Sequence, residues 1–195
     1  MEKNKEIVFI IHGWGGWPGE GWLPWLKNEL RKRDFIVYVP KMPNTNAPKI
    51  NAWVYKLRKL AKKADENTYF VGHSIGAQAI MRYLEKLPKG KKVGGVVFVA
   101  GWTSLTNLEL GEINTAKPWL ETKINFAKVK KSAKKFVAVF SNNDPYAPFS
   151  KNSKVFKQKL GAKIVIQHKK GHFSKSDGVK KLPIVLDELL KMVKK

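Results

Sequence analysis

Cysteine is absent from this chain of 195 residues, which excludes disulfide bonds, thiolate metal sites and cysteine nucleophiles. Long apolar runs are absent as well, because none approaches the ~20 residues that a membrane-spanning helix needs. Residues 1–6 are mostly polar and lead directly into an apolar segment, without the apolar core and cleavage site of a secretory signal. These absences lead us to expect a cytoplasmic protein without a membrane span.

Acidic residues are scarce: 15 Asp and Glu stand against 38 Lys and Arg, and the formal net charge is +23. Such a charge can attract nucleic acids, anionic lipids or anionic substrates. Most of it comes from lysine, whereas specific readout of bases and phosphates favours the planar guanidinium of arginine. The arginines are Arg31, Arg33, Arg58 and Arg82. We interpret the charge as a lysine-rich solvated surface without a specific nucleic-acid partner, and we keep polyanion binding as an alternative function.

Apolar runs alternate with segments of helical periodicity along the chain. Strands are expected at residues 6–11, 35–39, 68–71, 93–100, 136–140 and 162–166, and helices at 22–34, 51–64 (capped by Asn51), 77–84, 150–160 and 183–193. Continuous apolar runs are typical of strands that are covered on both faces of a parallel sheet. The sequence therefore predicts a three-layer α/β/α sandwich around a largely parallel sheet.

The length suits a single domain spanning residues 1–195, because no linker, repeat or low-complexity segment interrupts the pattern. Residues 102–131 are less regular and mix polar with aromatic side chains, so we expect a small cap of turns and short helices there. No dinucleotide-binding fingerprint and no metal-ligand cluster is visible in the sequence. We therefore expect neither a cofactor nor a metal.

Five residues between an expected strand and an expected helix, Gly72 to Gly76, read Gly-His-Ser-Ile-Gly. This pattern matches the nucleophile elbow, which holds a serine on a sharp turn at the carboxyl edge of a sheet. Side chains at the two glycine positions would collide with neighbouring strands. The five letters occur often by chance, but the strand-turn-helix context favours Ser74 as a nucleophile.

A serine hydroxyl needs a base to activate it, and the base needs an acid to orient it. In the fold that carries such an elbow, the acid and then the histidine follow the serine in the sequence. His172 lies on a loop after the last expected strand and can return over Ser74. His12, His73 and His168 are less suitably placed. We therefore predict His172 as the base.

Asp144 follows the strand expected at 136–140 and begins a rigid Asp-Pro-Tyr-Ala-Pro turn. An aspartate that starts a turn is common for structural reasons alone. Its position between the elbow and His172 favours the role of triad acid. Asp65 precedes the serine and Asp177 follows the histidine, so both have the wrong order.

Acyl transfer also needs donors for the oxyanion. The backbone N–H of Ile75, the residue after the serine, is one expected donor. The second is expected from Trp14, with Gly15 as an alternative, in the glycine-rich turn after the first strand. Buried aromatic residues mostly fill a core, but some are candidate substrate contacts: Trp102, Trp119 and Phe173.

These motifs together resemble those of the small serine hydrolase family that includes retinoblastoma-binding protein 9. The matching segments are His12-Gly13 with Trp-Leu-Pro-Trp-Leu at 22–26, Pro43, the elbow at 72–77, Asn-Asn-Asp-Pro-Tyr-Ala-Pro at 142–148 and Gly-His-Phe at 171–173. The resemblance covers essentially the whole chain. It implies an α/β-hydrolase fold with a minimal cap, and Ser74, Asp144 and His172 as a triad acting on ester or amide bonds.

The sequence thus predicts a serine hydrolase that cleaves a small-molecule carboxylic ester or amide through an acyl-serine intermediate. Two alternatives are a binding protein that keeps this fold without turnover, and a polyanion-binding protein.

Overall fold

A parallel sheet of six strands lies at the centre of the structure, a computed structural model that describes residues 5–193. The strands are β1 (Ile7–Ile11), β2 (Ile36–Tyr38), β3 (Thr68–His73), β4 (Gly95–Val99), β5 (Phe136–Ser141) and β6 (Lys163–Gln167). Their order is β2-β1-β3-β4-β5-β6, and every neighbouring pair is parallel. The carboxyl ends of all six strands therefore meet at one edge of the sheet.

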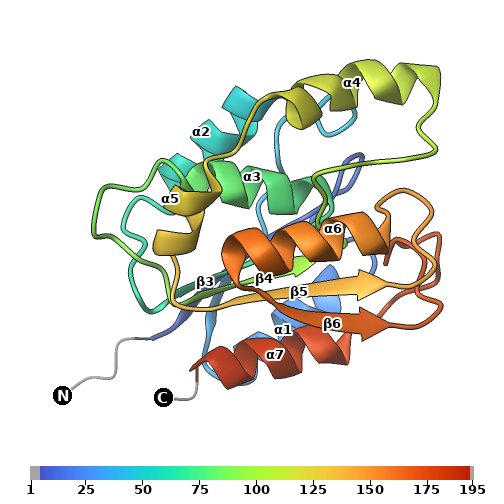
Figure 1. Cartoon of the computed structure of the whole chain (residues 1–195). Coiled ribbons are helices and arrows are strands. Elements are labelled where there is room, and N and C mark those ends of the chain that lie inside the picture. Colours follow the sequence, from blue (N-terminus) through green and yellow to red (C-terminus); the bar gives the residue numbers. More distant parts are fainter. Residues whose placement is uncertain (1–4, 194–195) are drawn as a thin grey trace.

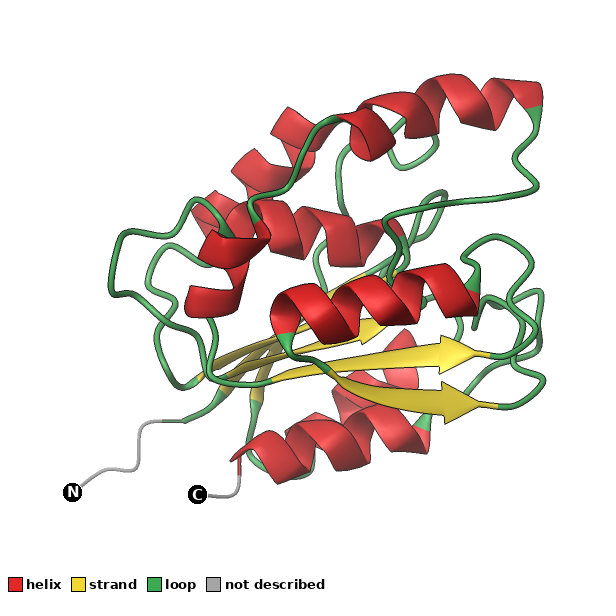
Figure 2. Cartoon of the chain, in the orientation of Figure 1, coloured by secondary structure: helices red, strands yellow, loops and turns green. Residues whose placement is uncertain are grey.

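Helices cover both faces of this sheet (Figures 1 and 2). They are α1 (Leu23–Arg31), α2 (Ile50–Leu60), α3 (Ile75–Leu84), α4 (Leu110–Glu121), α5 (Phe126–Lys131), α6 (Phe149–Val155), the π-helix η1 (Phe156–Leu160) and α7 (Pro183–Val193). Helices α1 and α7 cover one face, whereas α2, α3, α5 and α6 cover the other. This arrangement confirms the predicted α/β/α sandwich. Within residues 5–193, no helix is both long enough and apolar enough to cross a membrane.

The burial of the strands explains their continuous apolar sequences. β4 and β5 are buried at every residue, because helices pack on both of their faces. In β1, Val8 and Ile10 belong to the core under α1 and α7, while Phe9 and Ile11 belong to the opposite core. Alternate residues of one strand therefore fill two separate cores.

Some element boundaries differ from the sequence prediction. The cap expected at Asn51 is wrong, because α2 already begins at Ile50 and its cap residue is Lys49, which makes no side-chain cap hydrogen bond. The helix expected at 150–160 changes to π-helical geometry at Phe156. It ends before Gly161, whose φ of 67° lies in the left-handed region that glycine readily adopts.

The segment expected as a cap contains α4 and α5, and α4 lies on the outside of its helical layer (Figure 1). The C-terminal end of α4 is fixed to α3 by the buried Arg82, which donates to the carbonyl oxygens of Trp119 and Thr122, both at 2.8 Å. The N-terminal end of α4 instead borders the cavity described below. One end of α4 is thus held by the core and the other extends over the sheet edge.

Candidate active site

Ser74 occupies the sharp turn between β3 and α3, with a φ of 52° and a ψ of −119°. A positive φ is strained for a residue other than glycine, and the nucleophile elbow imposes this strain. The residues on either side of the turn are glycines because a side chain at either position would collide with neighbouring atoms. A Cβ at Gly76 would lie 2.5 Å from the carbonyl oxygen of Ile11 in β1, as predicted, but one at Gly72 would lie 2.6 Å from Ile80 Cδ1. Gly72 therefore makes room for α3 rather than for a neighbouring strand.

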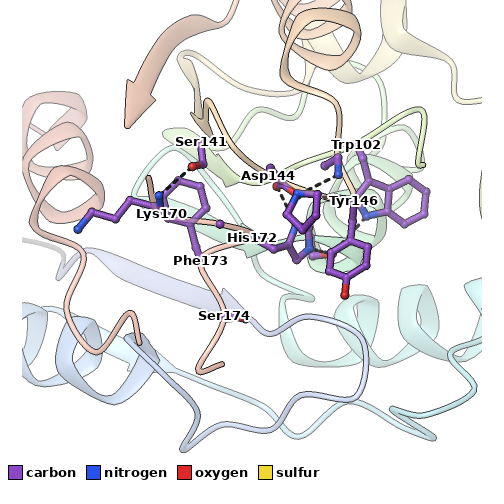
Figure 3. A network of polar contacts seen from close by, with 12 residues as sticks. Trp102, Ser141, Asp144, Tyr146, Lys170, His172, Phe173 and Ser174 are labelled. Carbon is purple, nitrogen blue, oxygen red and sulfur yellow. Dashed lines mark hydrogen bonds and ion pairs between the residues drawn. The ribbon is translucent and has the colours of Figure 1, made fainter. Parts of the chain in front are cut away.

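His172 lies between Ser74 and Asp144 in a chain of hydrogen bonds. Figure 3 shows His172 beside Asp144. Its Nε2 is 2.8 Å from Ser74 Oγ, and its Nδ1 is 2.8 Å from Asp144 Oδ2. Asp144 also accepts, at Oδ1, the backbone N–H groups of Tyr146 and Ala147. Because Asp144 accepts throughout, Nδ1–H of His172 donates to it, and Nε2 is left to accept the Ser74 proton. The structure brings together the three residues that the sequence selects.

The loop that carries His172 is held by two side chains that accept its backbone N–H groups. Asn143 Oδ1 accepts from Gly171 at 3.0 Å, and Asp177 Oδ2 accepts from His172 at 2.9 Å. Asp177 follows the histidine in the sequence and is therefore excluded as the acid. Among the described residues, its carboxylate makes no hydrogen bond to the imidazole ring of His172. Sequence reasoning missed both supporting roles. The only available signal was the position of Asn143 directly before Asp144.

The other histidines do not contact the Ser74 hydroxyl in the described residues. His12 is buried and its Nε2 accepts the backbone N–H of Met42 at 3.0 Å. His168 is hydrogen-bonded to the side chain of Asn142 at the surface, at 3.1 Å. Burial lowers the pKa of His12. These placements agree with the choice of His172 as the base.

His73, directly before the nucleophile, supports His172 from the side of the core. Its Nε2–H donates to the carbonyl oxygen of His172 at 2.7 Å, and its ring packs edge-on against Trp22. Burial, together with the nearby His172, lowers the pKa of His73 to about 4. His73 is therefore neutral at neutral pH and holds the His172 loop as a hydrogen-bond donor.

The buried His73 makes folding stability depend on pH. Its folded pKa of about 4 lies below its ordinary value of 6.5, so the unfolded chain binds more protons as the pH falls from 6.5 toward 4. The stabilisation is fully present above pH 6.5 and is lost over this window, at a cost of about 3 kcal/mol between pH 7 and pH 4. Urea denaturation at a series of pH values measures how the free energy of unfolding changes with pH. His73→Gln should remove the part of the slope between pH 6.5 and pH 4 that His73 causes, whereas His168→Gln at the surface should retain it. Equal slopes for wild type and His73→Gln would contradict the assignment.

Ile75 and Trp14 are the expected oxyanion donors, and their backbone N–H groups have no acceptor among the described residues. Ile75 begins α3, where the first N–H groups have no partner within a helix. Trp14 lines the same cavity as Ser74. The N–H of Gly15, by contrast, donates to the carbonyl oxygen of Thr45 at 2.8 Å. This occupied bond favours Trp14 over Gly15 as the second donor.

A cavity of about 500 Å³ opens onto Ser74 and His172. It is bordered by the turn after β1, by the loop after β4 and by the N-terminal part of α4. Trp102 lines it, as the sequence predicts for a substrate contact. The turn residue Tyr146 lines it as well and packs edge-on against His172 (Figure 3). The cavity therefore combines the hydrogen-bonded serine with aromatic walls.

The structure corrects the prediction that Trp119 and Phe173 contact substrate, because neither belongs to the cavity lining. Trp119 lies near the C-terminal end of α4, where its side chain is buried against Trp53, and its Nε1–H donates to the carbonyl oxygen of Pro48. Phe173 is fully buried in the core under α1 and α7. In Figure 3 its ring lies on the other side of His172 from Trp102. Both residues fill the cores, which is the usual role of buried aromatic side chains.

A strained serine above the carboxyl edge of a parallel sheet, with a histidine returning to it from the loop after the last strand, defines an α/β-hydrolase. Comparison with known families agrees. The family model described as Serine hydrolase matches residues 8–191, and the chain belongs to this family of hydrolases.

Known relatives support the same assignment. The chain is 34% identical to YdeN of Bacillus subtilis (strain 168) over 183 residues, which covers 93% of each protein. It is 25% identical to serine hydrolase RBBP9 of Rattus norvegicus, covering 98% of this chain and 94% of the relative. The crystal structure of the B. subtilis ydeN gene product superposes with a TM-score of 0.89 at 31% identity, covering 98% of this chain and all of that one. The resemblance predicted from the sequence motifs is confirmed.

Proposed function

We propose that this hydrolase cleaves a carboxylic ester or amide of a small molecule through an acyl-serine intermediate. The observation that carries the proposal is the continuous hydrogen-bonded chain from Asp144 through His172 to Ser74, with 2.8 Å at each link. Ser74 Oγ attacks the carbonyl carbon while His172 Nε2 takes its proton. Asp144 keeps the imidazole in the required tautomer and stabilises its charged form.

His172 gives this proton to the departing alcohol or amine, which completes the acyl-enzyme. His172 then accepts a proton from the attacking water and returns it to Ser74 as the acid is released. The backbone N–H groups of Trp14 and Ile75 are assigned to the oxyanion, a role in which one donor typically contributes 10²–10³ in rate. Residues 102–131 act as a small cap in this proposal, because α4 borders the cavity.

The charge of the cavity lining suggests which substrates are disfavoured. Glu20, Glu109 and Glu112 line it, and no Lys or Arg does among the described residues, although the sequence has 38. An anionic acyl chain would meet these carboxylates at short range. The lysine-rich surface therefore does not extend into the site, and neutral or cationic substrates fit it better than anionic ones.

This charge predicts a measurable selectivity. For p-nitrophenyl butyrate and the p-nitrophenyl monoester of succinate, we expect kcat/KM about tenfold lower for the succinate, because each unit charge at 4 Å costs about 1 kcal/mol even in water. The difference should shrink as salt is added, since ions screen it. Glu20→Gln should narrow the gap at low salt, with Glu66→Gln, on the distant Lys134 ion pair, as the matched control. Equal rates for the two esters at low salt would contradict this expectation.

The proposed mechanism is tested by stopped-flow hydrolysis of a short-chain p-nitrophenyl ester. Acyl-serine formation should release p-nitrophenolate in a burst approaching one equivalent per chain when deacylation is slower than acylation. A protein that binds the ester without turning it over, the alternative that shares this fold, would show neither a burst nor a steady state.

A further inference from the structure

Trp102 contacts the nucleophile itself. Its indole Nε1–H donates to Ser74 Oγ at 3.3 Å, on an oxygen that also lies 2.8 Å from His172 Nε2. We propose that Trp102 is a catalytic residue: its N–H stabilises the negative charge that Ser74 Oγ carries in the transition states. This inference rests on the acyl-serine mechanism proposed above and adds Trp102 to His172 as a second group that acts directly on Ser74 Oγ.

The other tryptophans show that this contact is unusual for the molecule. Four of them donate their indole N–H to a backbone carbonyl oxygen: Trp14 to Asn46, Trp22 to Phe173, Trp53 to Pro43 and Trp119 to Pro48. A carbonyl oxygen satisfies a buried indole without any functional consequence. Trp102, at 1% exposure, is as buried as Trp22, Trp53 and Trp119, yet its acceptor is the nucleophile oxygen.

The position of Trp102 is set by its surroundings. It follows β4 after a bend in which Ala100 has a φ of 47°, a strained value for a residue with a side chain. A Cβ at Gly101 would lie 2.9 Å from the Phe156 ring, so the chain can pass there only without a side chain. The buried Gln78 of α3 donates to the carbonyl oxygen of Trp102 at 2.7 Å. Strain at the bend and a buried hydrogen bond thus fix the indole over Ser74.

The proton and electron balance shows when the N–H acts. In the resting site the Ser74 hydroxyl donates its proton to His172 Nε2, and one Oγ lone pair accepts from Trp102. During attack the proton moves to His172, another Oγ lone pair forms the bond to the carbonyl carbon, and the carbonyl π electrons move to its oxygen. The carbonyl then re-forms, and the alcohol or amine leaves with the proton from His172. During deacylation water adds to the same carbon and gives a proton to His172. The bond between Oγ and that carbon then breaks, its electrons return to Oγ, and His172 gives Oγ the proton.

Oγ is therefore more negative in both transition states than in the neutral hydroxyl or the acyl ester. A hydrogen bond that is stronger in the transition state than in the ground state raises kcat rather than lowering KM. The indole N–H meets this condition, because it donates to Ser74 Oγ. Negative charge develops on this atom in each transition state and is lost again as each step completes.

Trp102→Phe removes the N–H and keeps an aromatic ring in the wall. We expect the rate constant for labelling by a fluorophosphonate, and kcat for p-nitrophenyl butyrate, to fall about tenfold, with KM changed by less than twofold. Trp53→Phe is the matched control, because it removes an indole N–H bound to the Pro43 carbonyl in the same core. The fluorophosphonate should label Trp53→Phe at the wild-type rate. A Trp102→Phe enzyme as fast as wild type would overturn the inference, as would a rise in KM at constant kcat.

A spectroscopic measurement keeps the inference testable even if Trp102→Phe folds poorly. In the ¹H–¹⁵N spectrum of the wild type, the indole N–H of Trp102 is assigned through its own ring protons. Replacing Ser74 with alanine should move this resonance upfield by more than any other indole resonance, because its acceptor is gone. An unchanged Trp102 resonance would overturn the inference. Wild-type protein that does not react with the fluorophosphonate would instead overturn the acyl-serine mechanism, so the two failures are distinguishable.

Discussion

Ser74→Ala is expected to lower kcat for p-nitrophenyl butyrate hydrolysis by about 10⁴–10⁶, measured as steady-state release of p-nitrophenolate. The loss is large because the acyl-enzyme cannot form, and His172 is left with no hydroxyl to deprotonate at its Nε2. The residual rate would come from substrate binding and the oxyanion donors alone. The variant should fold normally, because alanine removes only the two hydrogen bonds of the Ser74 hydroxyl, those with His172 and Trp102.

Ser104→Ala is the matched control for this result. Ser104 lies on the loop after β4, where its backbone N–H and hydroxyl contact Asn152 rather than the histidine. The control should retain the wild-type kcat. A Ser74→Ala enzyme that kept even a tenth of the wild-type rate would show that another nucleophile, or direct attack by water, accounts for the hydrolysis.

Asp144→Asn is expected to lower kcat by about 10⁴ while leaving the fold intact. The reason lies in the acceptor pattern of Asp144. Its Oδ1 accepts two backbone N–H groups, from Tyr146 and Ala147. An asparagine would keep its carbonyl oxygen at these donors and would turn its NH₂ group toward His172 Nδ1. The imidazole would then carry its proton on Nε2, where it cannot accept the serine proton.

The control for this change is Asp65→Asn, which alters an aspartate that organises the turn before β3 through Asn67 and Thr68. It should leave kcat unchanged. We also expect Asp144→Asn to react slowly with a fluorophosphonate, since that reaction needs the same activated serine. Rapid labelling of Asp144→Asn would contradict the role assigned to the carboxylate.

The elbow could be predicted from sequence because all of its determinants are local. The glycines at 72 and 76, the apolar strand and the helix that follows lie within twenty residues of one another, and the structure confirms the turn. The parallel sheet could be predicted for a related reason, since buried parallel strands carry apolar residues at every position. From the common edge of such a sheet it follows that Ser74, Asp144 and His172 lie close together.

What the sequence does not reveal is the direction in which a side chain points. Trp102, Trp119 and Phe173 are all aromatic residues near strand ends or in the expected cap, and nothing local distinguishes them. The structure places only Trp102 in the cavity, because the side chain of Trp119 packs from α4 into one core and Phe173, directly after His172, is buried in the opposite core. The same limit applies to Asp177, whose carboxylate supports the histidine backbone although its order excluded it as the acid.

Fluorophosphonate labelling followed by mapping of the modified residue tests the central claim most directly. After trypsin digestion, the peptide spanning residues 64–82 contains Ser74 as its only serine. The account predicts that this peptide gains the mass of one phosphonyl group, with little modification elsewhere, and that Ser74→Ala abolishes the label. An unlabelled 64–82 peptide in active protein, or a label that persists in Ser74→Ala, would contradict it.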